Sequence, residues 1–194
     1  DIVYHHFLFL PAMRLGINEE YKLPDYIPTR GHLTLESKKI SKSRNWYIGL
    51  KDFLKIFPSD YLRFYLVSIN PYSQDDLNFN WDEFATKINS ELIGNLGNLV
   101  NRALGFTVKS FNSIVPDPEK FDDMDKESEK MIHELASQLS VLMEENHLDR
   151  ALKKILQFSA HFNQYFQHKE PWKNGAGTNS CVFLAVNAVR SLAI

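Results

Sequence analysis

Two lysines and two serines occur within five consecutive residues, the run KISKS from Lys39 to Ser43. An acidic residue, Glu36, precedes the run and Arg44 follows it, and we call residues 36–45 the lysine loop. Mobile cations and hydroxyl donors with few apolar anchors suit a flexible clamp on a polyphosphate. A lysine- and serine-rich surface loop is also common and is usually only solvated, so the loop alone leaves both interpretations open.

Composition sets bounds on the function. The chain has 194 residues, which allows one domain or two small ones. Its 22 basic and 24 acidic residues nearly balance, which argues against a dedicated polycationic nucleic-acid binder. Locally, residues 36–55 are basic and could face phosphates, whereas residues 117–130 are acidic and are expected to form a solvated face away from RNA.

Cysteine and histidine usage argues against metal and disulfide chemistry. Cys181 is the only cysteine, which excludes an intrachain disulfide and a cysteine-built zinc site and fits a reducing cytoplasm. Neither the adjacent pair His5 and His6 nor the pair His161 and His168 has the spacing that places two imidazoles on one helical face, so no metal site is expected. No apolar run reaches the length of a membrane span.

The hydrophobic pattern predicts a mainly α chain. An apolar run over residues 2–10 could be a strand or a buried helix. A short strand is expected over 32–35, and short helices over 49–56 and 61–69. Helical periodicity then predicts a long helix over 80–111, two further helices through 131–142 and 149–170, and a last one over 182–192. Antiparallel helices of this kind form a bundle.

The long helix carries a polar stripe. At about 100° per residue, one narrow stripe contains Glu91, Asn95, Asn98 and Arg102. Amides and a guanidinium can read base edges, and a guanidinium can stack on a base. Nearby Gly94 and Gly97 each cost about 1 kcal/mol relative to alanine, which suggests close approach by another helix or by RNA. A solvated polar flank, with glycine serving helix packing, explains the stripe equally well.

Several segments, in their order and spacing, resemble the methionyl-tRNA synthetases, a family of class I aminoacyl-tRNA synthetases. They are DIVYHHFLFLP at 1–11, KISKS at 39–43, PSDYLRFYL at 58–66, NSELIGNLGN at 89–98, Arg102, and KEPWK at 169–173. The KISKS run resembles the KMSKS signature, with Ile40 in place of methionine. The HIGH signature is absent. We therefore expect a C-terminal fragment of such an enzyme, without detectable pyrophosphate exchange of its own.

The resemblance implies a three-part fold. Residues 1–35 would be the tail of a Rossmann-type nucleotide-binding domain, in which the apolar run is a helix. Residues 36–82 would form the KMSKS loop and stem-contact region. Residues 83–194 would form a truncated α-helical bundle that binds the anticodon.

The resemblance also implies the residues that act on ATP and methionine. Lys42, supported by Lys39, would stabilise charge on the phosphates while the methionine carboxylate attacks the α-phosphorus and pyrophosphate leaves. The other ATP contacts would be Asp1, Leu33, Ser41 and Ser43, and Mg²⁺ would accompany ATP. His6 would lie beside the methionine side chain, although a core histidine bonded to a carbonyl is the simpler structural explanation.

For the tRNA partner, tRNA(Met), the family recognises the CAU anticodon. The matching positions here are Asn98, Arg102 and Trp172. Trp172 follows Pro171 between two lysines, so it could stack on a splayed-out base, worth roughly 1–3 kcal/mol per base. A tryptophan that only plugs the end of the bundle is the alternative.

Two other functions stay open. One is a class I synthetase for leucine, isoleucine, valine or cysteine, against which the set Asn98, Arg102 and Trp172 argues. The other is a non-catalytic RNA-binding or scaffold fragment with a vestigial lysine loop, against which the intact lysines and serines argue.

Overall fold

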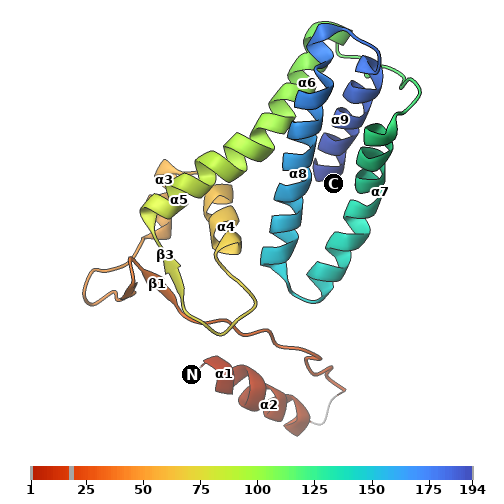
Figure 1. Cartoon of the computed structure of the whole chain (residues 1–194). Coiled ribbons are helices and arrows are strands. Elements are labelled where there is room, and N and C mark those ends of the chain that lie inside the picture. The colour runs from red at the N-terminus through yellow and green to blue at the C-terminus, as the bar shows by residue number, and fades with distance from the viewer. Residues whose placement is uncertain (1, 18–19, 194) are drawn as a thin grey trace.

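The computed structural model describes residues 2–17 and 20–193. Figure 1 shows a helical bundle at one end of the molecule and a separate N-terminal helix at the other, with a small sheet and two short helices between them. Within the described residues no helix combines the length and apolar character needed to cross a bilayer.

The N-terminal apolar run is helical, as the family resemblance implies. Three segments follow one another as α1 (Ile2–Tyr4), the π-helical η1 (His5–Phe9) and α2 (Leu10–Gly16). Pro11 is the second residue of α2 and follows η1 without a break, so its missing N–H removes one helical donor next to the π-helical turn. The apolar side chains of this helix are largely exposed, with Ile2 at 74% and Leu15 at 68%.

A three-stranded sheet holds the lysine loop. It contains β1 (Leu33–Leu35), β2 (Lys38–Lys39) and β3 (Leu77–Phe79) in the order β2-β1-β3. Strands β1 and β2 pair antiparallel, whereas β1 and β3 pair parallel with Thr34 opposite Asn78. Only the first strand was predicted from the sequence. Three-residue strands such as β3 have too little pattern to identify without their partner.

Two short helices and one long helix pack an aromatic core behind the sheet. The short helices are α3 (Leu50–Ile56) and α4 (Ser59–Ser68), and both match prediction. The buried core residues here include Phe53, Tyr65, Phe79 and Phe84. Helix α4 ends ahead of Pro71, since the residue before a proline avoids helical geometry.

The predicted long helix is continuous but not α-helical throughout. It consists of α5 (Trp81–Lys87), the π-helical η2 (Ile88–Gly97) and α6 (Asn98–Phe111). Figure 1 shows it running from the sheet up into the bundle. Gly94 belongs to the π-helical segment, and a Cβ at this position would lie 2.9 Å from the Asn89 carbonyl oxygen of the same helix. The π-helical backbone thus explains this glycine, and no other helix lies within 4 Å of such a Cβ among the described residues.

The bundle packs α6 with three further helices. These are α7 (Asp123–Glu144), α8 (Leu148–Lys169) and α9 (Thr178–Ala193), with the 3₁₀ turn η3 (Pro171–Lys173) after α8. The buried core includes Leu99, Leu135, Phe162 and Leu184. Helix α9 begins at Thr178, earlier than the predicted start at residue 182. It follows Gly177, whose φ of +83° is a backbone conformation that favours glycine.

Candidate functional site

The lysine loop is a folded hairpin rather than an unstructured clamp. Glu36 and Ser37 have positive φ values of 49° and 59°, which turn the chain from β1 into β2. Ser41 then pairs with Trp46 through two backbone hydrogen bonds of 2.8 and 2.9 Å. Asn45, with φ of 52°, donates its N–H to the Lys42 carbonyl at 3.0 Å and closes the tip.

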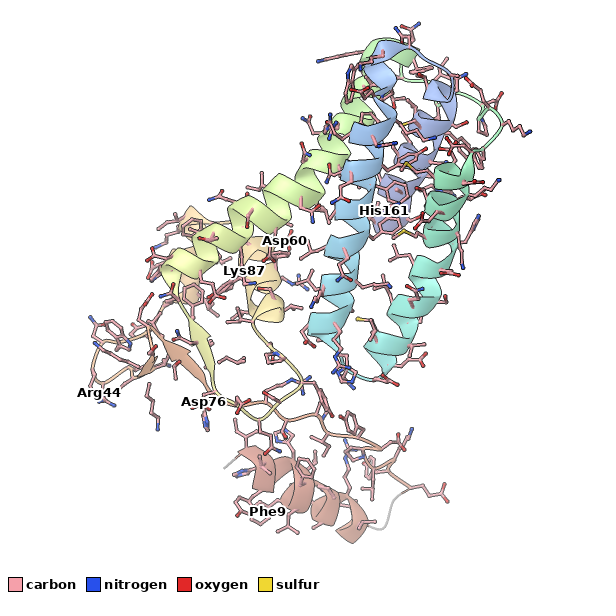
Figure 2. The ribbon with its side chains drawn as sticks, viewed as in Figure 1. Phe9, Arg44, Asp60, Asp76, Lys87 and His161 are labelled. Atoms are coloured by element: carbon pink, nitrogen blue, oxygen red, sulfur yellow. The ribbon has the colours of Figure 1, made fainter. Side chains whose placement is uncertain are left out.

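The side chains of this hairpin leave its positive charge exposed. Lys39 and Lys42 are both exposed, and neither forms an ion pair with residues 2–17 or 20–193. The hydroxyl oxygens of Ser41 and Ser43 lie 3.1 Å apart. Figure 2 shows Arg44 at the tip of the loop, pointing away from the bundle. Exposed cations beside paired hydroxyls are suited to an anionic ligand.

Leu33 and Lys39 lie on one depression of about 340 Å³ at the edge of the sheet. His32 and Asp76 also contribute to it, and the Asp76 carboxylate accepts the His32 backbone N–H at 2.8 Å. The structure therefore brings together two of the residues assigned to ATP. Lys42 is not among the residues that line this depression.

His6 lies on a second depression of about 530 Å³, between the N-terminal helix and residues 27–32. Its Nδ1 is 2.9 Å from the Ile2 carbonyl oxygen, and the side chain is exposed. The carbonyl bond matches the simpler structural explanation, but the histidine is not in a core. Asp1, the other residue assigned near the substrate, lies outside the described residues.

Asn98, Arg102 and Trp172 come together on the bundle, and we call them the Arg102 patch. The Arg102 guanidinium lies 5.8 Å from the ring centroid of Trp172 and 5.2 Å from that of Phe166. Trp172 is 43% exposed. It does not act as a buried plug, because almost half of the indole is open to solvent.

Helix α8 supplies polar partners for this patch. Asn98 Nδ2 donates to Asn163 Oδ1 at 2.8 Å. Arg102 donates from Nη1 to the Asn163 carbonyl at 3.4 Å and from Nη2 to Gln167 Oε1 at 2.9 Å. Sequence reasoning missed Asn163 and Gln167. The available signal was two amides four residues apart, each next to a buried phenylalanine.

A further depression lies beside the patch. Arg102, Asn163 and Gln167 line it together with His161 and His168, and its volume is about 780 Å³. Figure 2 shows His161 on α8 inside the bundle end of the molecule. Burial lowers the pKa of His161, so this imidazole favours its neutral form.

Comparison with known proteins identifies the family. Residues 1–104 match the family model described as tRNA synthetases class I (M). The chain belongs to the class I methionyl-tRNA synthetases.

Relatives match this synthetase chain over most or all of its length. A methionine–tRNA ligase of Pyrococcus horikoshii is 37% identical over 206 residues, covering 100% of this chain and 28% of the relative. One from Methanopyrus kandleri is 40% identical over 173 residues, covering 89% of this chain and 25% of the relative. The chain therefore spans little more than a quarter of the length of these relatives.

A solved structure shares the fold of this synthetase chain. Mycobacterium tuberculosis methionyl-tRNA synthetase in complex with methionyl-adenylate matches with a TM-score of 0.89 and 24% identity, covering 100% of this chain and 39% of that one. At this identity the match shows the fold alone.

Several polar groups near the Arg102 patch are already bonded within the synthetase bundle. The stripe on the long helix is not a free row of base readers, because Asn95 Nδ2 donates to the Leu156 carbonyl of α8 at 2.8 Å. Glu91 pairs with Lys87 at 3.2 Å. The lysines beside Trp172 are also engaged, since Lys173 Nζ lies 2.6 Å from the Glu170 carboxylate.

The acidic run is not merely a solvated face. Asp122 and Asp125 form a capping box at the start of α7, and both lie 2.6 Å from Lys169 Nζ. The Lys169 hydrogen bond lowers the pKa of Asp122. Burial alone would lower the pKa of Lys169, but the two carboxylates outweigh it and raise that pKa. These charges hold the end of α8 in place rather than facing RNA.

Among residues 2–17 and 20–193, no group of three or more His, Cys, Asp or Glu side chains is placed to hold a metal ion. Cys181 is fully buried, and burial raises the pKa of its thiol to about 12.

Proposed function

We propose that this chain is part of a methionine–tRNA ligase, which activates methionine with ATP and transfers it to tRNA(Met). The observation that carries the proposal is the Arg102 patch, where a half-exposed indole lies 5.8 Å from a guanidinium. An indole and a guanidinium can hold an unstacked base by stacking and hydrogen bonding. Asn98 beside them offers a hydrogen-bonding amide, and together they fit recognition of the CAU anticodon.

The lysine loop would supply the phosphate-binding part of the same enzyme. Lys39 and Lys42 would place positive charge where negative charge develops on the ATP phosphates, which lowers the barrier for adenylate formation. Ser41 and Ser43 would donate hydrogen bonds, and Leu33 would meet the adenine across the depression that it shares with Lys39. Mg²⁺ would be carried mainly by phosphate oxygens and water, as is usual for this ion.

The division of the chain follows from these roles. Residues 1–35 would complete the catalytic domain, with His6 beside methionine. Residues 36–82 would form the KMSKS loop and stem-contact region, and residues 83–194 would read the anticodon. The single, buried Cys181 is consistent with the reducing cytoplasm in which we place the enzyme.

The proposal is tested by binding of this chain to tRNA(Met) and to the same tRNA with its CAU anticodon changed. We expect at least about tenfold weaker binding to the altered tRNA, because a wrong base edge leaves hydrogen-bonding groups of Asn98 and Arg102 unpaired, which costs roughly 1–3 kcal/mol. Trp172→Ala should weaken binding to tRNA(Met) by a similar factor. All measurements use one ionic strength, since affinity for RNA depends strongly on salt.

The matched control is an exposed cation elsewhere on the bundle. Arg190, near the end of α9, is exposed, so Arg190→Ala should leave the preference for CAU unchanged, whereas Arg102→Ala should remove it. Equal binding of the unmodified chain to both tRNAs would contradict anticodon recognition. A preference for tRNA of leucine, isoleucine, valine or cysteine would instead favour another class I synthetase.

A further inference from the structure

A relay of side-chain amides connects the main chain of α8 to the Arg102 patch. Asn95 Nδ2 donates to the Leu156 carbonyl at 2.8 Å. Asn163 Nδ2 donates to Asn95 Oδ1 at 3.1 Å, to the Asn95 carbonyl at 2.9 Å and to the Ser159 carbonyl at 3.2 Å. Asn163 Oδ1 then accepts from Asn98 Nδ2 at 2.8 Å.

The side-chain amides of this relay can adopt only one orientation. Main-chain carbonyls can accept but cannot donate, so the NH₂ groups of Asn95 and Asn163 must face them. The Oδ1 of Asn163 is therefore fixed on the side of Asn98, and Asn98 has to turn its own NH₂ towards it. No residue in the described ranges 2–17 and 20–193 donates to Asn98 Oδ1. The last amide of the relay is left with a carbonyl oxygen of fixed orientation and no internal donor.

Arg102 completes a hydrogen-bonding pattern beside this oxygen. Its guanidinium can only donate, and it is held by the Asn163 carbonyl and by Gln167 Oε1. The patch thus presents an acceptor on Asn98 near donors on Arg102, and the Trp172 indole lies 5.8 Å from the Arg102 guanidinium. Cytosine and adenine carry an amino group next to a ring-nitrogen acceptor, whereas uracil and guanine carry an oxygen in place of that amino group.

Resting on the proposed function, we propose that Asn163 is a positioning residue for base recognition. It makes Asn98 an acceptor and thereby selects a base with an exocyclic amino group, cytosine or adenine, for the place beside Arg102 and Trp172. Without Asn163 the Asn98 amide is free to rotate by 180° and to offer NH₂ to a base carbonyl. Asn163 therefore governs the choice between bases rather than affinity alone.

The test uses RNA hairpins whose loop carries CAU, bound to the full 194-residue chain at one salt concentration. In one hairpin the cytosine is replaced by the analogue that lacks the 4-amino group. In another the adenine is replaced by the analogue that lacks the 6-amino group, and a third has a scrambled loop. We expect loss of one of the two amino groups to weaken binding about tenfold, and the affected base identifies the one held by Asn98.

Two protein variants then test the role of Asn163. In Asn163→Leu, removal of the base amino group should weaken hairpin binding by less than about twofold. The Asn98 amide can then turn either its oxygen or its NH₂ group towards the base. Asn187→Leu is the matched control, because Asn187 is a half-buried amide on α9 whose Nδ2 donates to the Phe183 carbonyl at 2.8 Å. It should keep the dependence on the amino group. A merely structural effect would weaken all hairpins equally and leave their ratio unchanged.

The outcomes separate this inference from the proposed function. If the chain prefers CAU to the scrambled loop but is indifferent to both amino groups, the inference is overturned while anticodon recognition stands. An unchanged ratio in Asn163→Leu overturns the positioning role. Equal binding to CAU and scrambled loops overturns both proposals. Should Asn163→Leu fail to fold, the unmodified chain with the amino-lacking hairpins still decides whether the site selects an amino group.

Discussion

At the scale of single residues, the cluster around Lys169 explains how Trp172 is held. The Lys169 side chain is 10% exposed and lies 2.6 Å from both Asp122 and Asp125, and Asp125 is 1% exposed. Tyr165 also donates its hydroxyl to Asp125 at 2.7 Å, and burial of that hydroxyl raises the pKa of Tyr165. A buried carboxylate with two such partners fixes the end of α8, from which Pro171 and Trp172 follow.

Replacing the buried cation should therefore destabilise the bundle. We expect Lys169→Met to lower the free energy of unfolding by about 3–5 kcal/mol, because Asp125 would remain buried without its counter-charge. Lys173→Met is the control and should cost less than about 1 kcal/mol, since the Lys173–Glu170 pair is exposed. Urea unfolding followed by circular dichroism measures both. Similar losses in the two variants would contradict a structural role for Lys169.

His161 should make stability depend on pH. Its folded-state pKa is lowered by burial, and its Nε2 lies 3.0 Å from the Ser128 hydroxyl. In the unfolded chain the imidazole has a pKa of about 6.5, so below this pH the unfolded chain binds the proton more readily than the folded one. The contribution of His161 to stability is therefore fully present above pH 6.5 and is lost as the pH falls towards the folded-state pKa. Unfolding at pH 7.5 and 5.5 should show this loss. It should shrink in His161→Gln and persist when the exposed His133 is changed to Gln.

At the scale of elements, the π-helical segment η2 sets how the long helix faces its neighbours. It occupies residues 88–97, directly before Asn98 and Arg102 on α6. Each extra residue per turn shifts the following side chains around the helix axis relative to a regular α-helix. Asn95, inside η2, reaches the Leu156 carbonyl of α8. The π-helical geometry thus helps to direct the polar stripe of the long helix towards α8 and towards the Arg102 patch.

Two glycines of η2 give a matched test of this geometry. A Cβ at Gly94 would lie 2.9 Å from the Asn89 carbonyl oxygen, whereas a Cβ at Gly97 would lie 3.5 Å from that of Leu92. We expect Gly94→Ala to lower the free energy of unfolding by about 1 kcal/mol, because crowding outweighs the gain in helix propensity. Gly97→Ala meets only ordinary contact and should raise it by up to about 1 kcal/mol. A similar gain in both variants would show that Gly94 does not need the π-helical backbone.

At the scale of the whole molecule, the long helix joins two surfaces with different chemistry. Its first turn is tied to the lysine loop by Glu36, whose carboxylate accepts from Asn80 Nδ2 at 2.7 Å and from the Trp81 N–H at 2.9 Å. Arg102 lies roughly 30 Å further along the same helix, at 1.5 Å per residue. The proposed phosphate-binding and base-binding surfaces are therefore separate in space, although one element positions both.

This separation predicts independent effects of the two surfaces on RNA binding. Arg102→Ala should weaken binding of a CAU hairpin by at least about tenfold, whereas Lys42→Ala should change it by less than about twofold. The double variant should equal the product of the two effects, because sites farther apart than about 10 Å usually act additively. Titration of a labelled hairpin with the four proteins measures this. Strong weakening by Lys42→Ala would place the loop in contact with the anticodon hairpin.

The sequence by itself determined the helices and the candidate residues. Helical periodicity placed the long helix and the bundle, and Pro71 marked the end of α4, because these signals are local. The set Asn98, Arg102 and Trp172 came from the resemblance to the methionyl-tRNA synthetases. The structure brings the three together, with the Arg102 guanidinium 5.8 Å from the Trp172 ring. Their part in reading an anticodon stays a prediction.

Only the tertiary structure decided which polar groups remain available for a ligand. Asn98 and Asn163 are 65 residues apart in sequence, so no local pattern reveals that one fixes the orientation of the other. Lys169 is two residues before Pro171, yet its Nζ pairs with Asp122 and Asp125 at the start of another helix. Strand β3 likewise exists through pairing with β1. Burial and hydrogen bonding depend on partners distant along the chain, and only packing of the helices determines them.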